Sequence, residues 1–344
     1  MLLLLLLAGC QPGGPVTHER LPAFGSTVEI EIGGGDRDRN KQAIAEAAAL
    51  LDRRTREWHA WKPSDLTRIN AAFKAGQAVE APDSIIDLVR RSQAFSRSSD
   101  GLLDPAVGGL VELWGFHAAK FPVTTPAPSA GQIETWVQSH PSVLDISIQG
   151  HNLSSRNPAV QLDFKAIAEG VVAQNLADIF HRHGIANALI SFGSDAYALG
   201  IGDSRSRHVG MKDPYGGALG GVDLGDGEAF FSSGNYNQFR ETINGGRWGH
   251  ILDPRSGMPA RGAAATGVLV DDPALADAAS TALSVAGPSG FAHIVAQMKI
   301  RCAVMVTDEN ELLITTAMQK RMQFQREPVL LGKPLNAGTE CSSK

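Results

Sequence analysis

The stretch from Asp163 to Ile201 reads DFKAIAEGVVAQNLADIFHRHGIANALISFGSDAYALGI and combines one helical pattern with two strand patterns. Apolar residues recur at helical spacing from Ile167 to Phe180, and Gly184 is typical of a residue that ends such a helix. The pattern then predicts strands at 188–192 and 196–201. Because two consecutive strands follow the helix, without a steady strand–helix–strand alternation, the stretch favours an α+β fold over a doubly wound parallel sheet.

The rest of the chain continues this irregular mixture of strands and helices. We expect strands at 27–32, 302–307 and 311–315, and helices at about 41–58, 82–98 and 272–287. Residues 118–135 are rich in Pro and Thr, which predicts a surface excursion. No Gly-x-Gly-x-x-Gly leads from a strand into a helix, so the sequence does not support a Rossmann dinucleotide site.

The composition is that of a globular protein. Of 344 residues, 43% are hydrophobic and 19% are charged, which is enough for one large core or two small ones. The net charge is −5, and no stretch is dense in Lys or Arg. Because nucleic-acid binding requires such basic stretches to neutralise phosphates, the composition argues against a nucleic-acid partner.

The first ten residues, MLLLLLLAGC, form a short apolar run that ends in a Leu-Ala-Gly-Cys box and resembles a bacterial lipoprotein signal. A transmembrane helix is the alternative, but it requires about 20 apolar residues, and this run is shorter. The sequence therefore predicts a signal peptide at 1–9, an acylated Cys10 and a tether at 10–20. A folded domain at 21–325 and a C-terminal tail at 326–344 follow, lipid-anchored on the periplasmic side of a bacterial membrane.

Cys302 and Cys341 are the two cysteines that remain beside Cys10. In an oxidising compartment they could pair. Two residues define no disulfide framework, however, so the sequence leaves open whether they pair.

Asp277 and Thr281 lie four residues apart in the run ADAASTA, inside the helix that Asp272 is placed to cap. At this spacing both side chains project from one helix face. A carboxylate and a hydroxyl form an oxygen pair that suits Mg²⁺, which binds few protein ligands and keeps places for water and phosphate. The alternative is a solvated Asp and a Thr that bonds to the helix backbone.

Three further polar segments are candidates for a site. Residues 249–259, GHILDPRSGMP, place His250 and Arg255 in a turn-forming loop, although a hairpin whose His bonds locally is an equal alternative. The segment SSGNY at 232–236 offers backbone amides to a phosphate. Asp163 and Glu169 lie where a strand passes into a helix, whose N-terminus attracts a pyrophosphate; capping and solvation are the alternative for these two carboxylates.

Taken in order, these segments resemble the ApbE family of FAD:protein FMN transferases. The matching segments are Phe24–Thr27, Trp61–Asn70, Gly101–Pro105 with Trp114–Phe116, Asp163–Gly170, Phe192–Asp195, Ser232–Tyr236, His250–Pro254 and Ala276–Thr281. Each segment is weak alone, but their shared order is specific. The resemblance implies an α+β fold of mixed sheets with packed helices and an FAD site between two subdomains.

The resemblance also implies roles for individual residues. Asp277 and Thr281, with the backbone carbonyl of Ala166, would hold Mg²⁺ at the FAD pyrophosphate, and His250 and Asp277 would be the catalytic residues. The residues that match the family's flavin-nucleotide contacts are Phe24, Trp61, Leu102, Leu103, Asp104, Asp163, Glu169 and Ile251. Trp61 offers a stacking face, and the carboxylates offer hydrogen-bond acceptors.

The activity implied is Mg²⁺-dependent transfer of FMN from FAD to a Ser or Thr of an acceptor protein, with release of AMP. An FAD pyrophosphatase that uses water as the acceptor is one alternative, and a flavin-binding lipoprotein without catalysis is another. The expected partners are FAD, the membrane through the lipid anchor, and extracytoplasmic acceptor subunits of membrane redox complexes.

Overall fold

The computed structural model describes residues 16–118, 120–200, 207–242, 245–325, 327 and 329–341. The predicted signal peptide and Cys10 lie outside these residues. Among the described helices, none combines the length and the apolarity needed to cross a membrane.

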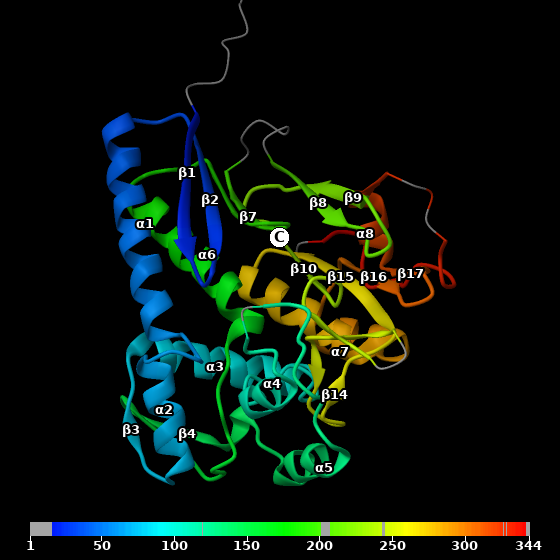
Figure 1. Cartoon of the computed structure of the whole chain (residues 1–344). Coiled ribbons are helices and arrows are strands. Elements are labelled where there is room, and N and C mark those ends of the chain that lie inside the picture. The colour runs from blue at the N-terminus through cyan, green and yellow to red at the C-terminus, as the bar shows by residue number, and fades with distance from the viewer. Residues whose placement is uncertain are drawn as a thin grey trace, which may run out of the picture.

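An eight-stranded antiparallel sheet forms the centre of the molecule (Figure 1). Its spatial order is β1-β2-β6-β7-β10-β15-β16-β17. These strands are β1 (Val16–Ala23), β2 (Ser26–Gly33), β6 (Ala188–Phe192), β7 (Asp195–Leu199), β10 (Ala229–Gly234), β15 (Ala263–Val270), β16 (Ala303–Thr307) and β17 (Leu312–Ile314). Every neighbouring pair is antiparallel, which confirms the α+β class expected from the helix and hairpin of residues 163–201.

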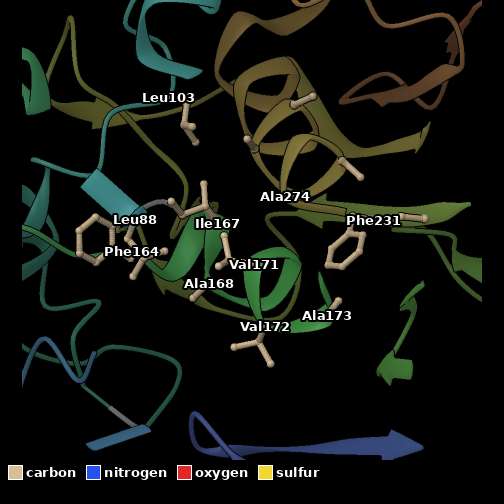
Figure 2. Close-up of a cluster of buried hydrophobic side chains, with 14 of the residues drawn as sticks. Leu88, Leu103, Phe164, Ile167, Ala168, Val171, Val172, Ala173, Phe231 and Ala274 are labelled. Carbon is tan, nitrogen blue, oxygen red and sulfur yellow. The ribbon is translucent and has the colours of Figure 1, made fainter. Parts of the chain in front are cut away.

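Helices cover one face of this sheet. They are α1 (Arg37–Glu57), α6 (Lys165–Arg182) and α7 (Pro273–Gln297), and α3 (Asp83–Ser98) packs against α6 and α7. Figure 2 shows Ile167 and Val171 of α6 in one cluster with Phe231 of β10 and Ala274 of α7. Because side chains alternate along a strand, Phe231 faces the helices whereas its neighbour Phe230 faces the other side of the sheet.

The opposite face is covered by a small sheet and the C-terminal part of the chain. The small sheet has the order β18-β9-β8, with β18 (Gln323–Phe324), β9 (Ala218–Asp223) and β8 (His208–Lys212), and α8 (Thr316–Arg321) packs beside it. The sequence suggests only a Gly-rich connection at 216–227. A Cβ on Gly220 would lie 2.5 Å from the carbonyl oxygen of Gln323, so close strand packing accounts for this glycine.

The remaining elements surround the lower end of the helical layer in Figure 1. They are α2 (Asp65–Lys74), β3 (Val79–Glu80), α4 (Gly108–Trp114), α5 (Ala130–Ser139), the 3₁₀ turn η1 (Val143–Asp145), β4 (Ile146–Gln149), β5 (Asn152–Ser155), β11 (Phe239–Glu241), β12 (Arg247–Gly249), β13 (Leu252–Asp253) and β14 (Met258–Pro259). Trp114 anchors a separate apolar cluster here, and its indole nitrogen donates a hydrogen bond to the carbonyl of Gly257 at 2.8 Å.

Two boundaries differ from those the sequence suggests. Residues 16–20, expected in the tether, form the first part of β1 and pair with β2. This edge strand is mostly exposed, so it lacks the apolar alternation that marks a buried strand. The helical backbone breaks at Gly287, as the sequence suggests, where φ is 64° and ψ is −174°, but a second helical segment that the sequence does not suggest follows this kink and extends α7 to Gln297.

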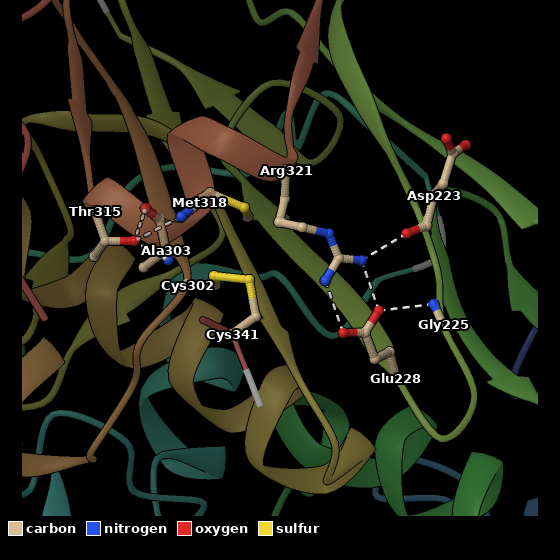
Figure 3. Close-up of a disulfide and its surroundings, with 9 residues drawn as sticks. All are labelled: Asp223, Gly225, Glu228, Cys302, Ala303, Thr315, Met318, Arg321 and Cys341. Carbon is tan, nitrogen blue, oxygen red and sulfur yellow. Dashed lines mark hydrogen bonds and ion pairs between the residues drawn. A yellow bond between two sulfur atoms is a disulfide. The ribbon is translucent and has the colours of Figure 1, made fainter. Parts of the chain in front are cut away.

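Cys302 and Cys341 form a disulfide, which answers the question that the sequence leaves open (Figure 3). It fastens the C-terminal segment, which lies along the edge of β17: the amide of Leu331 donates to the carbonyl of Leu312 at 2.7 Å. Nearby, the guanidinium of Arg321 donates two hydrogen bonds to the carboxylate of Glu228, at 2.8 and 2.7 Å. The segment thus adds Cys341 and Leu330 to the apolar cluster on this face of the central sheet.

Candidate active site

Helices α6 and α7 pack unusually closely, and this contact positions Asp277. A Cβ on Gly170 would lie 2.3 Å from the carbonyl oxygen of Pro273, so only glycine allows the approach. The backbone amide of Gly170 donates a hydrogen bond to Oδ2 of Asp277 at 3.0 Å. Asp277 is therefore held at the junction of the two helices, with part of its side chain exposed.

Thr281 lies one turn further along α7 and meets the end of β10. Its hydroxyl lies 3.2 Å from that of Ser233, which lies 2.7 Å from the hydroxyl of Ser280. On the same strand, Ser232 donates hydrogen bonds from its amide and its hydroxyl to Oδ1 of Asp195, both at 2.8 Å. The polar segment 232–236 thus joins α7 to the start of β7.

Three carboxyl groups gather at this junction: Glu169 from α6, Asp195 from β7 and Asp277 from α7. Burial raises the pKa of Glu169 from its ordinary 4.5 to about 7, although Lys165 opposes the shift. Burial, and next the negative charge of Glu169, raise the pKa of Asp195 to about 8. The same two causes, in the same order, raise the pKa of Asp277 well above 3.8, and Asp195 adds to them.

These groups fit a divalent cation, because such an ion would relieve the repulsion among them. A carbonyl oxygen has two lone pairs, so that of Ala166, in the first turn of α6, can also serve as a ligand. In the part of the chain that the structure describes, no three His, Cys, Asp or Glu residues form a metal-ligand group. Mg²⁺ does not require one, since it binds through one or two carboxylates and other oxygens.

His250 follows β12, and its backbone amide donates to the carbonyl of Gln238 at 3.0 Å. Its Nδ1 atom is buried and has no hydrogen-bond partner among the described residues. Burial, and next the positive charge of Lys165, lower the pKa of His250 to about 3. The imidazole is therefore neutral at pH 7. The next residue, Ile251, is buried, and its amide donates to Oδ1 of Asn235 at 3.2 Å.

Trp61 and Asp163 form the aromatic side of the site. The indole nitrogen of Trp61 donates to Oδ2 of Asp163 at 3.1 Å, and Oδ1 of Asp163 accepts the amide of Lys165 at 3.0 Å. The ring of Trp61 lies 5.1 Å from that of His117. Asp163 thus links the start of α6 to the indole.

Asp104 is buried, and its carboxylate holds neighbouring segments together. Oδ1 accepts the amides of Ala106 and Val143, both at 2.9 Å, and Oδ2 accepts the hydroxyls of Ser142 at 2.7 Å and Ser96 at 3.4 Å. Burial raises its pKa, whereas these hydrogen bonds oppose the shift. Its contact with a nucleotide stays a prediction.

The apolar members of the predicted set belong to the core beside α6. Leu102 and Leu103 are buried, and Figure 2 places Leu103 in the cluster that contains Ile167. Phe24 lies in the turn between β1 and β2 with a φ of 52°, and its ring stacks on Trp58 at 6.0 Å. For these residues as well, contact with a flavin stays a prediction.

Three residues of the cluster received no role from the sequence: Asp195, Lys165 and Gln238. Asp195 and Lys165 lie within segments that carry the family resemblance, and this was a usable signal. Gln238 carried no such signal, because its importance comes from contacts with residues distant in the chain.

Comparisons with known proteins all indicate the same family. The model of the ApbE family matches residues 24–306. The chain is 36% identical over 310 residues to the FAD:protein FMN transferase of Rhodobacter capsulatus, covering 90% of this chain and 59% of that relative. It is 28% identical to a protein of the same name from Klebsiella pneumoniae (strain 342), covering 89% of this chain and 91% of the relative.

Solved structures agree with this assignment. The apo form of the Pseudomonas stutzeri flavinyl transferase ApbE superposes with a TM-score of 0.76 at 26% identity, covering 91% of this chain and 99% of that chain. The ApbE protein of Thermotoga maritima gives a TM-score of 0.78 at 24% identity, covering 91% of this chain and 100% of that chain. These matches confirm the expected mixed fold.

Proposed function

The chain belongs to the ApbE family, and on this premise we propose that it transfers the FMN half of FAD to a Ser or Thr side chain of an acceptor protein and releases AMP. Relatives named FAD:protein FMN transferase support this proposal. In the reaction, the acceptor oxygen forms a bond to the FMN phosphorus, the pyrophosphate bond breaks, and the hydroxyl proton leaves.

The observation that carries the proposal is the junction of Asp277 with the amide of Gly170 and the nearby carboxyl groups of Glu169 and Asp195. At this junction Asp277 and Thr281 lie one turn apart on α7, and Mg²⁺ binds through one or two carboxylates together with other oxygens. Asp277, Thr281 and the Ala166 carbonyl would hold Mg²⁺, which supplies positive charge to neutralise a pyrophosphate.

The other residues of the site have distinct tasks in this proposal. Trp61 supplies an indole face to a flavin or adenine ring, and its bond to Asp163 fixes the orientation of that face. His250 is neutral, so its imidazole can take part in activating the acceptor hydroxyl or in a hydrogen bond that positions the phosphate. Most of the rate then comes from alignment and charge neutralisation.

We also propose that the enzyme works on the periplasmic side of a bacterial membrane, held there by acylated Cys10. The Leu-Ala-Gly-Cys box supports this location, and so does the Cys302–Cys341 disulfide, since disulfides persist in oxidising compartments. The acceptors would be extracytoplasmic subunits of membrane redox complexes.

Intact-protein mass spectrometry of a candidate acceptor domain tests the activity. The acceptor is incubated with the enzyme, FAD and Mg²⁺, and AMP is assayed in parallel. The proposal expects a mass gain of one FMN moiety that a chelator abolishes. AMP without an adduct indicates a pyrophosphatase, and tight FAD binding without either product indicates a non-catalytic flavin-binding protein.

A further inference from the structure

Lys165 connects the first turn of α6 to the segment between β10 and β11. Its ammonium group donates a hydrogen bond to the side-chain oxygen of Gln238. The backbone carbonyl of the same Gln238 accepts the amide of His250 at 3.0 Å. Gln238 therefore contacts Lys165 through its side chain and His250 through its backbone.

The positive charge of Lys165 is not neutralised by a direct ion pair. Among the described residues, no carboxylate oxygen lies within 4.0 Å of its ammonium, and its hydrogen-bond acceptor is a neutral amide. The surrounding protein lowers the pKa of Lys165 by desolvation, although its side chain is partly exposed, and the negative charges of Asp163 and Glu169 oppose that shift. A cation held by a neutral acceptor stays available to an anion.

We propose that Lys165 is a substrate-anchoring residue, whose ammonium binds a phosphate oxygen of FAD while Gln238 holds the side chain in place before the substrate arrives. This inference rests on the proposed function. Lys165 precedes Ala166, so it shares the first turn of α6 with an expected metal ligand. A lysine acts as a compact point charge on such a phosphate.

Two neighbours support this assignment. Glu169 lies four residues after Lys165 on the same helix face, and its negative charge would repel a pyrophosphate. Lys165 offsets that charge within the same site. Lys165 also acts electrostatically on His250, whose buried Nδ1 has no hydrogen-bond partner among the described residues.

The test compares FAD with riboflavin, which has no phosphate. Dissociation constants are measured from flavin fluorescence in the presence of Mg²⁺, without an acceptor. For Lys165→Met we expect the FAD constant to rise roughly tenfold or more, the size of a lost charge-assisted hydrogen bond, while the riboflavin constant stays unchanged. Lys165→Arg should retain most of the FAD affinity, and Gln238→Leu should cause a smaller loss.

Lys74→Met is the matched control, because Lys74 is an exposed lysine at the end of α2. Circular dichroism verifies that each variant folds. Unchanged FAD affinity in Lys165→Met would overturn the inference, and so would an equal loss for FAD and riboflavin, which indicates a general structural role. If the wild type flavinylates its acceptor, either result leaves the proposed function standing. If the wild type binds no FAD, both the inference about Lys165 and the proposed function are contradicted.

Discussion

The carboxylate of Asp277 on α7 accepts the backbone amide of Gly170 on α6 at 3.0 Å, although the two residues are 107 positions apart in the chain. This hydrogen bond depends on the absence of a side chain at Gly170, because the carbonyl of Pro273 occupies that space. Gly170 thus has two roles: it allows α6 and α7 to pack closely, and it holds Asp277 in the proposed metal site.

Gly170→Ala is expected to destabilise the protein and impair the site together. The new methyl group would force α6 and α7 apart, at a cost of about 1–3 kcal/mol for overpacking. Urea denaturation measures the stability, and Mg²⁺ titration of the transfer rate measures the site. Gly131→Ala is the control, because a Cβ there meets nothing within 4 Å. If Gly170→Ala has the same stability and Mg²⁺ dependence as this control, the close packing of α6 and α7 is not required for either.

Asp277→Asn is expected to slow transfer by a factor on the order of 10²–10³, comparable to the loss of one preorganised electrostatic group. Its stability should be unchanged or slightly higher, since burial disfavours the charged form of this carboxyl group, as its raised pKa indicates, and the amide carries no charge. Initial rates and melting temperatures measure the two effects. Asp178→Asn changes an exposed carboxylate on α6 and should retain full activity. Full activity of Asp277→Asn, with unchanged Mg²⁺ dependence, would contradict the assignment.

The buried carboxyl group of Asp195 is expected to contribute a loss of stability to the apo protein as the pH rises from about 4 to about 8. Burial raises the folded-state pKa of Asp195 from 3.8 to about 8, so the folded state holds this proton more tightly than the unfolded chain. The stability that this proton provides is complete below the unfolded pKa and is lost as the pH rises through the folded one. Melting temperatures across this range should fall less for Asp195→Asn than for the wild type. Parallel curves for the two proteins would exclude Asp195 as the cause.

Cys341→Ser is expected to reduce stability by about 2–4 kcal/mol, because the disulfide closes a long loop in the unfolded chain. The lost bond joins residues 39 positions apart and fastens the segment along β17. Urea denaturation with and without dithiothreitol measures the effect: the reductant should lower the stability of the wild type to that of the variant. A wild type insensitive to full reduction, verified by thiol counting, would show that the tail stays in place without the bond.

Local patterns predicted much of the secondary structure. The helical spacing from Ile167 to Phe180 corresponds to α6, and the strands expected at 188–192 and 196–201 correspond to β6 and β7. The helix at 272–287 was correct in its start and in its break at Gly287, but the pattern did not predict the second helical segment that follows the kink and extends α7 to Gln297. The edge strand β1 was missed at residues 16–20, since its exposed residues show no apolar alternation.

The sequence by itself determined the α+β class, the spacing that places Asp277 and Thr281 on one helix face, and the ordered segments that indicate the family. Each of these depends on residues near one another in the chain or on their order along it. The tertiary structure alone decided that Glu169, Asp195 and Asp277 share one site, that Gln238 joins Lys165 to His250, and that Cys302 pairs with Cys341. The physical reason is that these contacts join different elements, and their formation depends on how helices and strands pack rather than on the periodicity of any one of them.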